Sequence, residues 1–247
     1  MTKTGTEYSR GFLMRSENAA TQVKKRYQGK EGKVYHQKHD VPQAAHKWIA
    51  RNRAEKLVPY INPDDIVLEY GVGPGWNLEA IGCQQRLGYD LATFLEKPLA
   101  AKGIRFVADI KTVPDVSIDT IICHHVLEHT LNPTKILGEI KRMLKDDGRL
   151  VLIVPYEKER KCRSFTPNEP NHHLYSWNVQ TLGNLVNDMG FSIQQSGIGR
   201  YGYDRFLAVL ALRLKIGAAG FRWLKKLALA VNPLWEVRIV ANKKGLA

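Results

Sequence analysis

The sequence predicts an α/β fold in which a mostly parallel sheet of seven strands carries helices on both faces. Short apolar segments rich in β-branched residues alternate with helical periodicities from residue 66 to residue 195, and this alternation is typical of parallel sheets. A glycine-rich turn follows the first of these segments, where such folds place a ligand-binding loop. The segments 191–195 and 235–241 enclose a helical insertion, so we expect an antiparallel last strand after it.

The first quarter of the chain is expected to form a basic helical extension that spans residues 1–61. Helical patterns occur at 18–28 and, more clearly, at 43–61, where apolar side chains recur near helical spacing. The run Asn62-Pro63-Asp64-Asp65 is a turn signal. We place the start of the main domain, 62–247, at this turn.

Turn and capping signals set the element boundaries within the main domain. Gly148 and Gly190 follow helical patterns as C-terminal caps, and Pro155 is expected to stop the strand before it. The predicted strands are 66–68, 86–90, 104–107, 119–123, 149–154, 191–195 and 235–241, and the predicted helices are 77–81, 133–144 and 179–189. The ligand site is expected in the loops after the first five strands, because ligands bind beyond the carboxyl ends of parallel strands.

The insertion, 206–234, combines apolar and basic residues. Two apolar runs, 206–212 and 227–231, occur among arginines and lysines, and Gly217 and Gly220 separate them. An amphipathic basic segment suits the headgroup layer of an anionic membrane, so 206–231 is a candidate membrane-contacting surface. The alternative is a lid or a dimer surface whose charges are simply solvated.

The positive charge of the chain is concentrated at its two ends. The net charge is +13, of which residues 1–62 contribute +8, residues 63–199 contribute −3 and residues 200–247 contribute +8. Such ends could contact phosphate, an anionic membrane face or an acidic substrate. They could equally form a solvated basic surface without a partner.

Three features favour a cytoplasmic protein. Cys83, Cys123 and Cys162 are too widely spaced for a disulfide framework or a paired-cysteine metal site. The N-terminal segment lacks the apolar core of a signal peptide, and no segment approaches the ~20 apolar residues that a membrane span requires. We expect a cytoplasmic location, either free or peripheral at the inner face of the membrane.

The loop 69–75, with the sequence EYGVGPG, is the sharpest functional signal. Its glycines permit positive φ and a close approach of the backbone to a ligand. Asp90 lies 19 residues past Gly71 at the end of the second predicted strand, where a carboxylate can accept hydrogen bonds from a ribose. Asp109 ends the third predicted strand and could meet an adenine amino group. The glycine spacing differs from the GxGxxG of dinucleotide-binding loops, and NAD binding is the competing interpretation.

Taken together, these segments resemble the class I S-adenosylmethionine-dependent methyltransferases, in particular their type 11/23 group. VLEYGVGPG is similar to the family's first motif, LGYDLA to its ribose-binding strand end and FVADI to its adenine-contacting segment. The resemblance covers about residues 60–200 and implies a Rossmann-like fold with S-adenosyl-L-methionine as the methyl donor. The residues that would surround the donor are Glu69, Gly71, Gly73, Gly75, Asp90, Asp109, Ile110 and His124.

The segment 123–129, CHHVLEH, lies at the mouth of the expected site. A histidine with a pKa near 6.5 could take a proton from an attacking hydroxyl, although strings of this kind also serve as packing turns. Glu128 resembles an active-site glutamate of the cyclopropane synthase branch. The segment also resembles the Glu-x-x-Glu-His metal site of ubiquinone-pathway O-methyltransferases, but His125 replaces the first glutamate. His125, Glu128 and His129 could bind a divalent ion; with this replacement we predict no metal.

The segment 168–177, NEPNHHLYSW, follows the fifth predicted strand. It resembles the family's Pro-His-Leu-x-x-Phe segment, with His173 at the histidine position, and the family usually places acceptor-binding groups here. Its polar and aromatic residues suit a sugar or another hydroxylated ring, unless Tyr175 and Trp177 only pin the loop to the sheet. We predict His125, Glu128 and His173 as the catalytic residues, with the two histidines as the favoured bases.

The resemblance implies methyl transfer, and we expect O-methylation of a small hydroxylated acceptor such as a sugar or a lipid-linked or cell-surface glycan. An RNA methyltransferase is one alternative, but no RNA-binding module or stacking platform is evident. A non-catalytic adenosyl-binding scaffold at the membrane is the other. The expected partners are the acceptor, an anionic membrane surface through 206–231 and a second copy of the chain in a homodimer, whereas nucleic acid is not expected.

Overall fold

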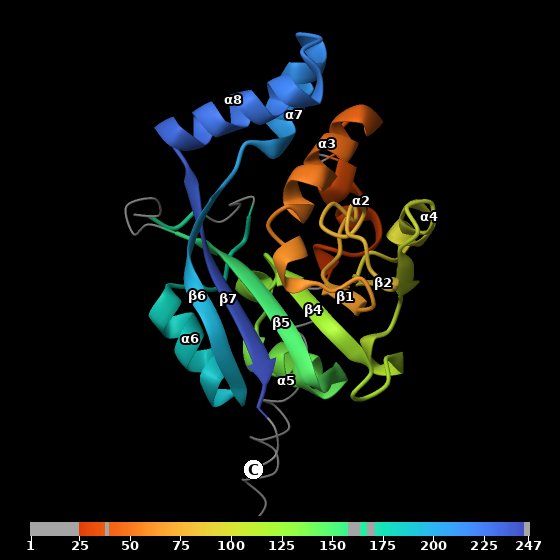
Figure 1. Ribbon diagram of the computed structural model, residues 1–247, viewed down its shortest axis with the longest axis vertical. Helices are drawn as coiled ribbons and strands as arrows, with labels where there is room; N and C mark the ends of the chain where they lie inside the picture. The colour runs from red at the N-terminus through yellow and green to blue at the C-terminus, as the bar shows by residue number, and fades with distance from the viewer. Residues whose placement is uncertain (1–24, 38–39, 158–163, 167–170, 245–247) are drawn as a thin grey trace, which may run out of the picture.

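The computed structural model describes residues 25–37, 40–157, 164–166 and 171–244 and forms a seven-stranded sheet in the order β3-β2-β1-β4-β5-β7-β6 (Figure 1). The strands are β1 Ile66–Tyr70, β2 Gln85–Tyr89, β3 Arg105–Val107, β4 Ile118–His124, β5 Leu144–Tyr156, β6 Phe191–Tyr201 and β7 Leu234–Lys243. Neighbouring strands are parallel except at β7, which runs antiparallel to both β5 and β6. The predicted fold class is confirmed, including the antiparallel last strand and the helical insertion before it.

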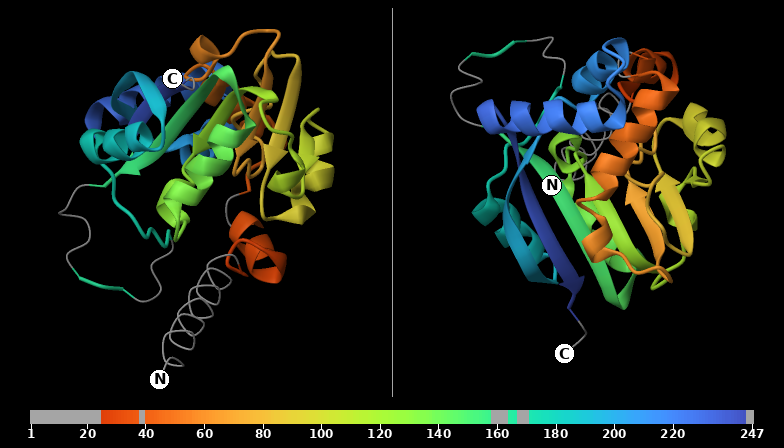
Figure 2. Two further views of the ribbon diagram at one scale, coloured as in Figure 1. Left: turned by 90° about the horizontal axis from the view of Figure 1, so that it is seen from below. Right: turned by 45° about the horizontal axis from the view of Figure 1, so that its top comes forward.

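The helices connect these strands and cover both faces of the sheet (Figures 1 and 2). They are α2 Gly29–Gln37, α3 Gln43–Ala54, α4 Glu96–Ala100, α5 Pro133–Met143, α6 Val179–Asp188, α7 Asp204–Arg213 and α8 Gly217–Val231. Four short 3-10 helices are η1 Val58–Tyr60, η2 Thr93–Leu95, η3 Ile110–Thr112 and η4 Leu127–His129. Among the described residues no helix is both long and apolar enough to span a membrane.

Two apolar cores lie on opposite faces of the sheet. Successive residues of a strand point to opposite faces, so Leu68 and Ile121 join one core with α5 and α6, whereas Val67 and Ile122 join the other with α4 and the end of α3. The central strands are buried on both sides, which explains their continuous apolar sequence. The sheet is therefore a rigid platform for the loops at its carboxyl edge.

A third core joins α3 to the insertion formed by α7 and α8, beyond the carboxyl ends of the parallel strands (Figure 1). Ile49 of α3 packs in it with Ala208 of α7 and Phe221 of α8, and all three side chains are fully buried. Asp204 at the start of α7 pairs with Arg53 at 3.2 Å and with Lys225 of α8. The extension and the insertion consequently form one layer above the sheet edge.

Several expected element boundaries differ from the structure; strand β6, expected at 191–195, continues to Tyr201. The helix expected at 77–81 is wrong: this segment forms turns, because Asn77 bonds the buried Glu69 and the backbone makes only isolated turn bonds. The helix expected at 43–61 ends at Ala54 and is followed by η1, which contains Pro59. Strand β5 continues through Pro155 to Tyr156, because both residues pair with β7. It also begins at Leu144, so Asp147 and Gly148 lie within β5 instead of ending α5.

The N-terminal helical pattern expected at 18–28 lies mostly outside the described residues. Helix α2 at 29–37 was not expected, because glycines at positions 29 and 32 give its sequence a weak helical signal. The backbone of Gly32 lies against that of Tyr27, where an added Cβ would be 2.3 Å from the Tyr27 carbonyl oxygen. The glycine is therefore needed for close packing of this turn.

Candidate active site

One large cleft lies at the carboxyl edge of the parallel strands, and residues from α2, α3 and α7 line it together with the strand-end loops. Its volume is about 1570 Å³, whereas single small-molecule sites usually occupy about 300–1,000 Å³. The cleft therefore has room for two ligands side by side. All eleven residues predicted for catalysis or donor binding except Gly75 line it.

The glycine-rich loop forms one wall of the cleft and has the backbone conformation that its glycines predict. Gly71, Gly73 and Gly75 have φ values of 81°, 50° and 82°, which other residues rarely adopt. A Cβ on Gly71 would be 2.4 Å from Cγ2 of Val126, whereas a Cβ on Gly73 would meet no atom within 4 Å. Gly71 is thus needed for packing, and Gly73 leaves the backbone open to the cleft.

Glu69 and Asn77 form a buried polar pair in the same wall. The Asn77 amide donates to Oε1 of Glu69, while Oε2 of Glu69 and Oδ1 of Asn77 have no hydrogen-bond partner among the described residues. Burial raises the pKa of Glu69 to about 8, although the Asn77 hydrogen bond opposes this rise. With this pKa Glu69 holds a proton near pH 7, and the positive charge of an amino group bound in the cleft would lower the pKa of Glu69, so that its Oε2 accepts from that group together with Oδ1 of Asn77.

Asp90 ties the glycine-rich loop to the end of β2. Its Oδ2 accepts from the backbone N–H of Gly73 and its Oδ1 from that of Ala92, both at 2.9 Å. Each carboxylate oxygen retains a second lone pair, so Asp90 can still accept from the hydroxyls of a bound ribose. Asp109 is exposed and accepts from the N–H of Lys111 at 3.0 Å, while the neighbouring Ile110 is buried at the cleft.

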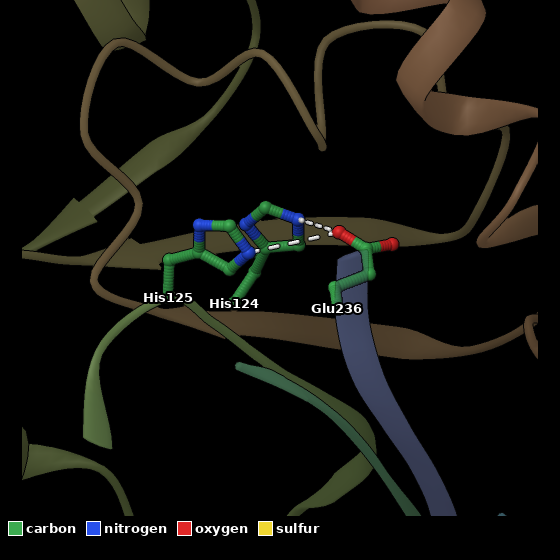
Figure 3. A group of neighbouring side chains, drawn as sticks. All are labelled: His124, His125 and Glu236. Atoms are coloured by element: carbon green, nitrogen blue, oxygen red, sulfur yellow. Dashed lines mark ion pairs between the residues drawn. The ribbon is translucent and has the colours of Figure 1, made fainter. Parts of the chain in front are cut away.

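At the end of β4, His124 and His125 lie next to Glu236 of β7 (Figure 3). Their rings stack with centroids 4.2 Å apart, and Oε2 of Glu236 is 3.9 Å from Nε2 of His124 and 3.6 Å from Nε2 of His125. Nζ of Lys56, which follows α3, lies 2.9 Å from Nε2 of His124 and 3.1 Å from Oε1 of Glu236. Since an ammonium only donates, Nε2 of His124 accepts this bond and His124 is neutral.

The charges of this group are strongly coupled. Burial alone would raise the pKa of Glu236, but His125, Lys56 and Arg238 lower it overall, so Glu236 is ionised. Burial lowers the pKa of Lys56 to about 8 although Glu236 opposes this. Burial also lowers the pKa of His125, against the effect of Glu236. His125 is therefore a neutral imidazole near pH 7, the protonation state that a general base requires.

His125 is held in an uncommon conformation. Its φ is 56°, a value that costs free energy in a non-glycine residue and persists only where the surroundings impose it. Its backbone N–H donates to the carbonyl of Ile153 at 2.8 Å, and its ring meets Tyr201 edge-on with centroids 5.0 Å apart. The first contact holds the backbone of His125 against β5, and the second holds its ring against Tyr201 of β6.

Glu128, His129 and His173 form a second group in the cleft. Glu128 is fully buried, neither of its carboxylate oxygens has a hydrogen-bond partner among the described residues, and burial raises its pKa to about 8. The ring centroids of His129 and His173 are 4.9 Å apart, and Nδ1 of His173 lies 2.9 Å from Oε1 of Glu157. Burial and the nearby His173 lower the pKa of His129 to about 4.

Two groups in the described part of the chain could hold a metal ion. One is Glu128 with His129 and His173, and the other is His124 with His125 and Glu236; in each, the potential ligand atoms lie within 4.8 Å of one another. Both groups combine two imidazoles with one carboxylate, a ligand set that suits divalent transition ions. The set considered from sequence, His125 with Glu128 and His129, is not brought together as one group.

Lys56, Tyr201 and Glu236 are site residues that the sequence pattern did not identify. Glu236 is a charged residue inside an apolar strand and is fully buried, which is rare unless the charge is paired or functional. This signal was available in the sequence. Lys56 reaches the site only because α3 packs above the sheet edge, and no local pattern predicts that packing.

Comparisons with known proteins agree with this geometry. The family model described as "Methyltransferase domain" matches residues 32–196. A probable S-adenosylmethionine-dependent methyltransferase of Mycobacterium tuberculosis is 27% identical over 159 residues, which cover 58% of this chain and 55% of that protein. The chain thus spans about half the length of the curated relatives it matches.

Solved structures show the same fold at low sequence identity. A putative methyltransferase of Bacillus halodurans is 14% identical with a TM-score of 0.56, over 78% of this chain and 98% of that one. The [4+2]-cyclase SpnF is 17% identical with a TM-score of 0.55, over 82% of each chain. The name of the second protein describes no methyl transfer, so the fold alone does not define the reaction.

The donor implied by the family fits the residues of the cleft. S-adenosylmethionine carries an amino acid group with an ammonium, and the unpartnered oxygens of Glu69 and Asn77 are suitable acceptors for it. Asp90 can accept from its ribose, and the open backbone at Gly73 leaves space beside it. The histidines line the same cleft and leave a second region for an acceptor.

Proposed function

This chain belongs to the class I S-adenosylmethionine-dependent methyltransferase family, and from this premise we propose that it methylates a hydroxyl oxygen of a small hydroxylated acceptor. A sugar or a lipid-linked or cell-surface glycan is the acceptor class we favour. The observation that carries the proposal is the neutral His125, held by its backbone and by Tyr201 beside the ionised Glu236, in the cleft that also contains Glu69 and Asp90. This arrangement supplies a base where the donor residues meet the open part of the cleft.

In the proposed mechanism His125 receives the acceptor's proton. Bound S-adenosylmethionine supplies an electrophilic methyl group on a sulfonium. Nε2 of His125 faces Glu236, and its Nδ1 lies on the side of the ring away from that carboxylate (Figure 3). Nδ1 is therefore the nitrogen that takes the proton, and the resulting imidazolium is stabilised by Glu236. Holding the two reactants in one cleft supplies much of the remaining rate enhancement.

The acceptor is assigned to the region around Glu128 and His173. His173, Glu157 and Asn171 supply polar groups there, and Tyr201 and Trp235 supply aromatic surfaces. Sugars are commonly bound by this combination of hydrogen-bonding groups and flat apolar rings. We assign Glu128 and His173 to holding the acceptor's hydroxyls, with the enzyme working in the cytoplasm or at the inner face of the membrane.

The proposal is tested in two steps with the purified full chain. Calorimetric titration with S-adenosylmethionine and S-adenosylhomocysteine, with NAD as the control, should show micromolar binding of the adenosyl pair alone. Incubation with S-adenosylmethionine and a panel of sugar nucleotides, lipid-linked glycans and RNA should then produce S-adenosylhomocysteine with a sugar nucleotide or a glycan and not with RNA. Turnover with RNA would replace the proposal by the RNA interpretation, and binding without turnover on any acceptor would favour the scaffold.

A further inference from the structure

Helix α8 has two adjoining apolar faces, one packed and one exposed. Phe221, Leu224 and Ala228 pack into the core shared with α3 and α7. Trp223, Leu227 and Val231 lie on another side of the helix and are 64%, 51% and 79% exposed. Their spacing of four residues places them in one row. Core packing accounts for the first face and leaves the second without a partner in the described part of the chain.

A row of basic side chains runs beside the exposed apolar row. Lys215, Arg222 and Lys226 are all exposed, and each immediately precedes a residue of the apolar side: Ile216, which is 42% exposed, Trp223 and Leu227. At 100° per residue, Arg222 and Lys226 are adjacent to Trp223 and Leu227 on the surface of α8, whereas Lys215 and Ile216 lie just before this helix, which begins at Gly217. The long basic side chains can therefore reach past the apolar row toward negative charge.

The free face lacks acidic residues of its own. Asp204 is the one acidic residue between positions 204 and 231, and it is paired with Arg53 and Lys225 in the packed layer. In a two-fold symmetric contact between copies, the same patch faces itself. Such a contact through this face would bring two basic rows together without a counter-charge, so a second copy of the chain fits it poorly.

The free face also lies close to the cleft entrance. Arg205, at the start of α7, and Asn232, directly after α8, both line the cleft, as do Leu234 and Trp235 of β7. Phe206, next to Arg205, is 68% exposed. Helix α8 lies at the top of the view in Figure 1, above the ends of β6 and β7. A flat partner could rest on α8 without contacting the sheet.

We propose that the outer face of the α7–α8 hairpin docks the protein on an anionic lipid surface. Trp223, Leu227 and Val231 enter the headgroup boundary, and Lys215, Arg222 and Lys226 contact the lipid phosphates. The helix lies in the membrane plane and does not cross it. The cleft entrance is then next to the bilayer, where a lipid-linked acceptor would be presented. The docking itself does not depend on methyl transfer.

Vesicle co-sedimentation of the full chain tests this proposal. We expect binding to vesicles of phosphatidylcholine with phosphatidylglycerol, little binding to phosphatidylcholine alone, and release at about 0.5 M salt, where charges are screened within a few ångström. Trp223→Ser combined with Leu227→Ser should reduce binding by at least tenfold. Arg222→Gln combined with Lys226→Gln should reduce it by about fivefold per charge removed.

The matched control is Lys47→Gln combined with Lys97→Gln, which removes the same charge from exposed positions on α3 and α4. This variant should bind vesicles nearly as well as the unmodified chain. Circular dichroism and titration with S-adenosylhomocysteine should show that each variant folds and keeps its donor site, so that failure of docking is separable from failure of the proposed reaction.

Absence of vesicle binding by the unmodified chain, or an equal loss of binding in the control variant, would overturn the proposal. A dimer that dissociates in the Trp223 and Leu227 variant would overturn it in favour of a second copy.

Discussion

The carboxylate of Glu236 lies 3.6 Å from Nε2 of His125, although the two residues come from β7 and the end of β4. Glu236 is fully buried and also accepts hydrogen bonds from Lys56 and Arg238. A buried carboxylate with two cationic partners remains ionised. It is therefore available to orient His125 and to stabilise the positive charge that His125 would acquire.

We predict that Glu236→Gln lowers kcat by about 10- to 100-fold, by analogy with the loss of a carboxylate that orients a metal-binding histidine. Glu236 raises the pKa of His125, so its loss should lower that pKa further. The acid limb of the pH–rate profile, along which His125 becomes protonated and inactive, should then move to lower pH. Glu96→Gln, an exposed change on α4, should leave the profile unchanged. An unshifted acid limb in folded Glu236→Gln protein would remove Glu236 from the mechanism.

Asp90→Asn should weaken binding of S-adenosylhomocysteine by at least tenfold, because a neutral amide accepts more weakly from the ribose and offers one oxygen in place of two. The substitution should also destabilise the folded protein, since Asp90 accepts hydrogen bonds from the N–H groups of Gly73 and Ala92. The loss of one of these bonds should reduce the free energy of unfolding by about 1–2 kcal/mol. Calorimetric titration and urea unfolding measure the two effects, with exposed Asp64→Asn as the control. Unchanged affinity would contradict the ribose assignment.

Glu128 should make the protein less stable as the pH rises from about 5 to 8. Burial raises its folded pKa to about 8, from an ordinary value of 4.5. Between these values the folded state holds a proton that the unfolded state has released, so the free energy of unfolding falls as the pH increases. The glutamine in Glu128→Gln cannot ionise. Between pH 5 and pH 8 the free energy of unfolding should therefore change less in this variant than in the unmodified chain, by a difference on the order of a few kcal/mol. Urea unfolding at both pH values checks this, and parallel curves for the two proteins would contradict it.

The alternation of strands and helices and the conformation of the glycine-rich loop could be predicted because their signals are local. Turn glycines, strand-end carboxylates and β-branched segments are patterns formed by neighbouring residues, so each can be recognised in the sequence alone. The φ values of Gly71, Gly73 and Gly75 and the position of Asp90 beside them follow from this local pattern. The expected helix at 77–81 was wrong: the segment forms turns, and the Asn77 amide donates to the buried Glu69 of the preceding strand, a contact that local propensity does not include.

The arrangement of the histidines could not be predicted, because it depends on contacts between distant segments. His129 meets His173 from a loop after β5, whereas His125 meets Glu236 from the last strand. Sequence spacing placed His125, Glu128 and His129 in one group, but the ring of His125 lies beside Glu236 of β7, whereas His129 lies beside His173. Lys56 joins the site through tertiary packing of α3, which has no signature in the sequence around it.

The comparison of His125 with His173 tests which histidine is the base. His125→Ala should lower kcat by about 10²- to 10⁴-fold, the range for loss of a general base, with the affinity for S-adenosylhomocysteine nearly unchanged. Added imidazole should restore part of the activity, because it can enter the space left by the ring. His173→Ala should instead raise KM for the acceptor more than it lowers kcat, since Nδ1 of His173 already contacts Glu157 at 2.9 Å and its role is to hold the acceptor. Initial rates over a range of acceptor concentrations separate these effects. A normal rate in His125→Ala, with a rate loss and imidazole rescue in His173→Ala, would transfer the role of base to His173.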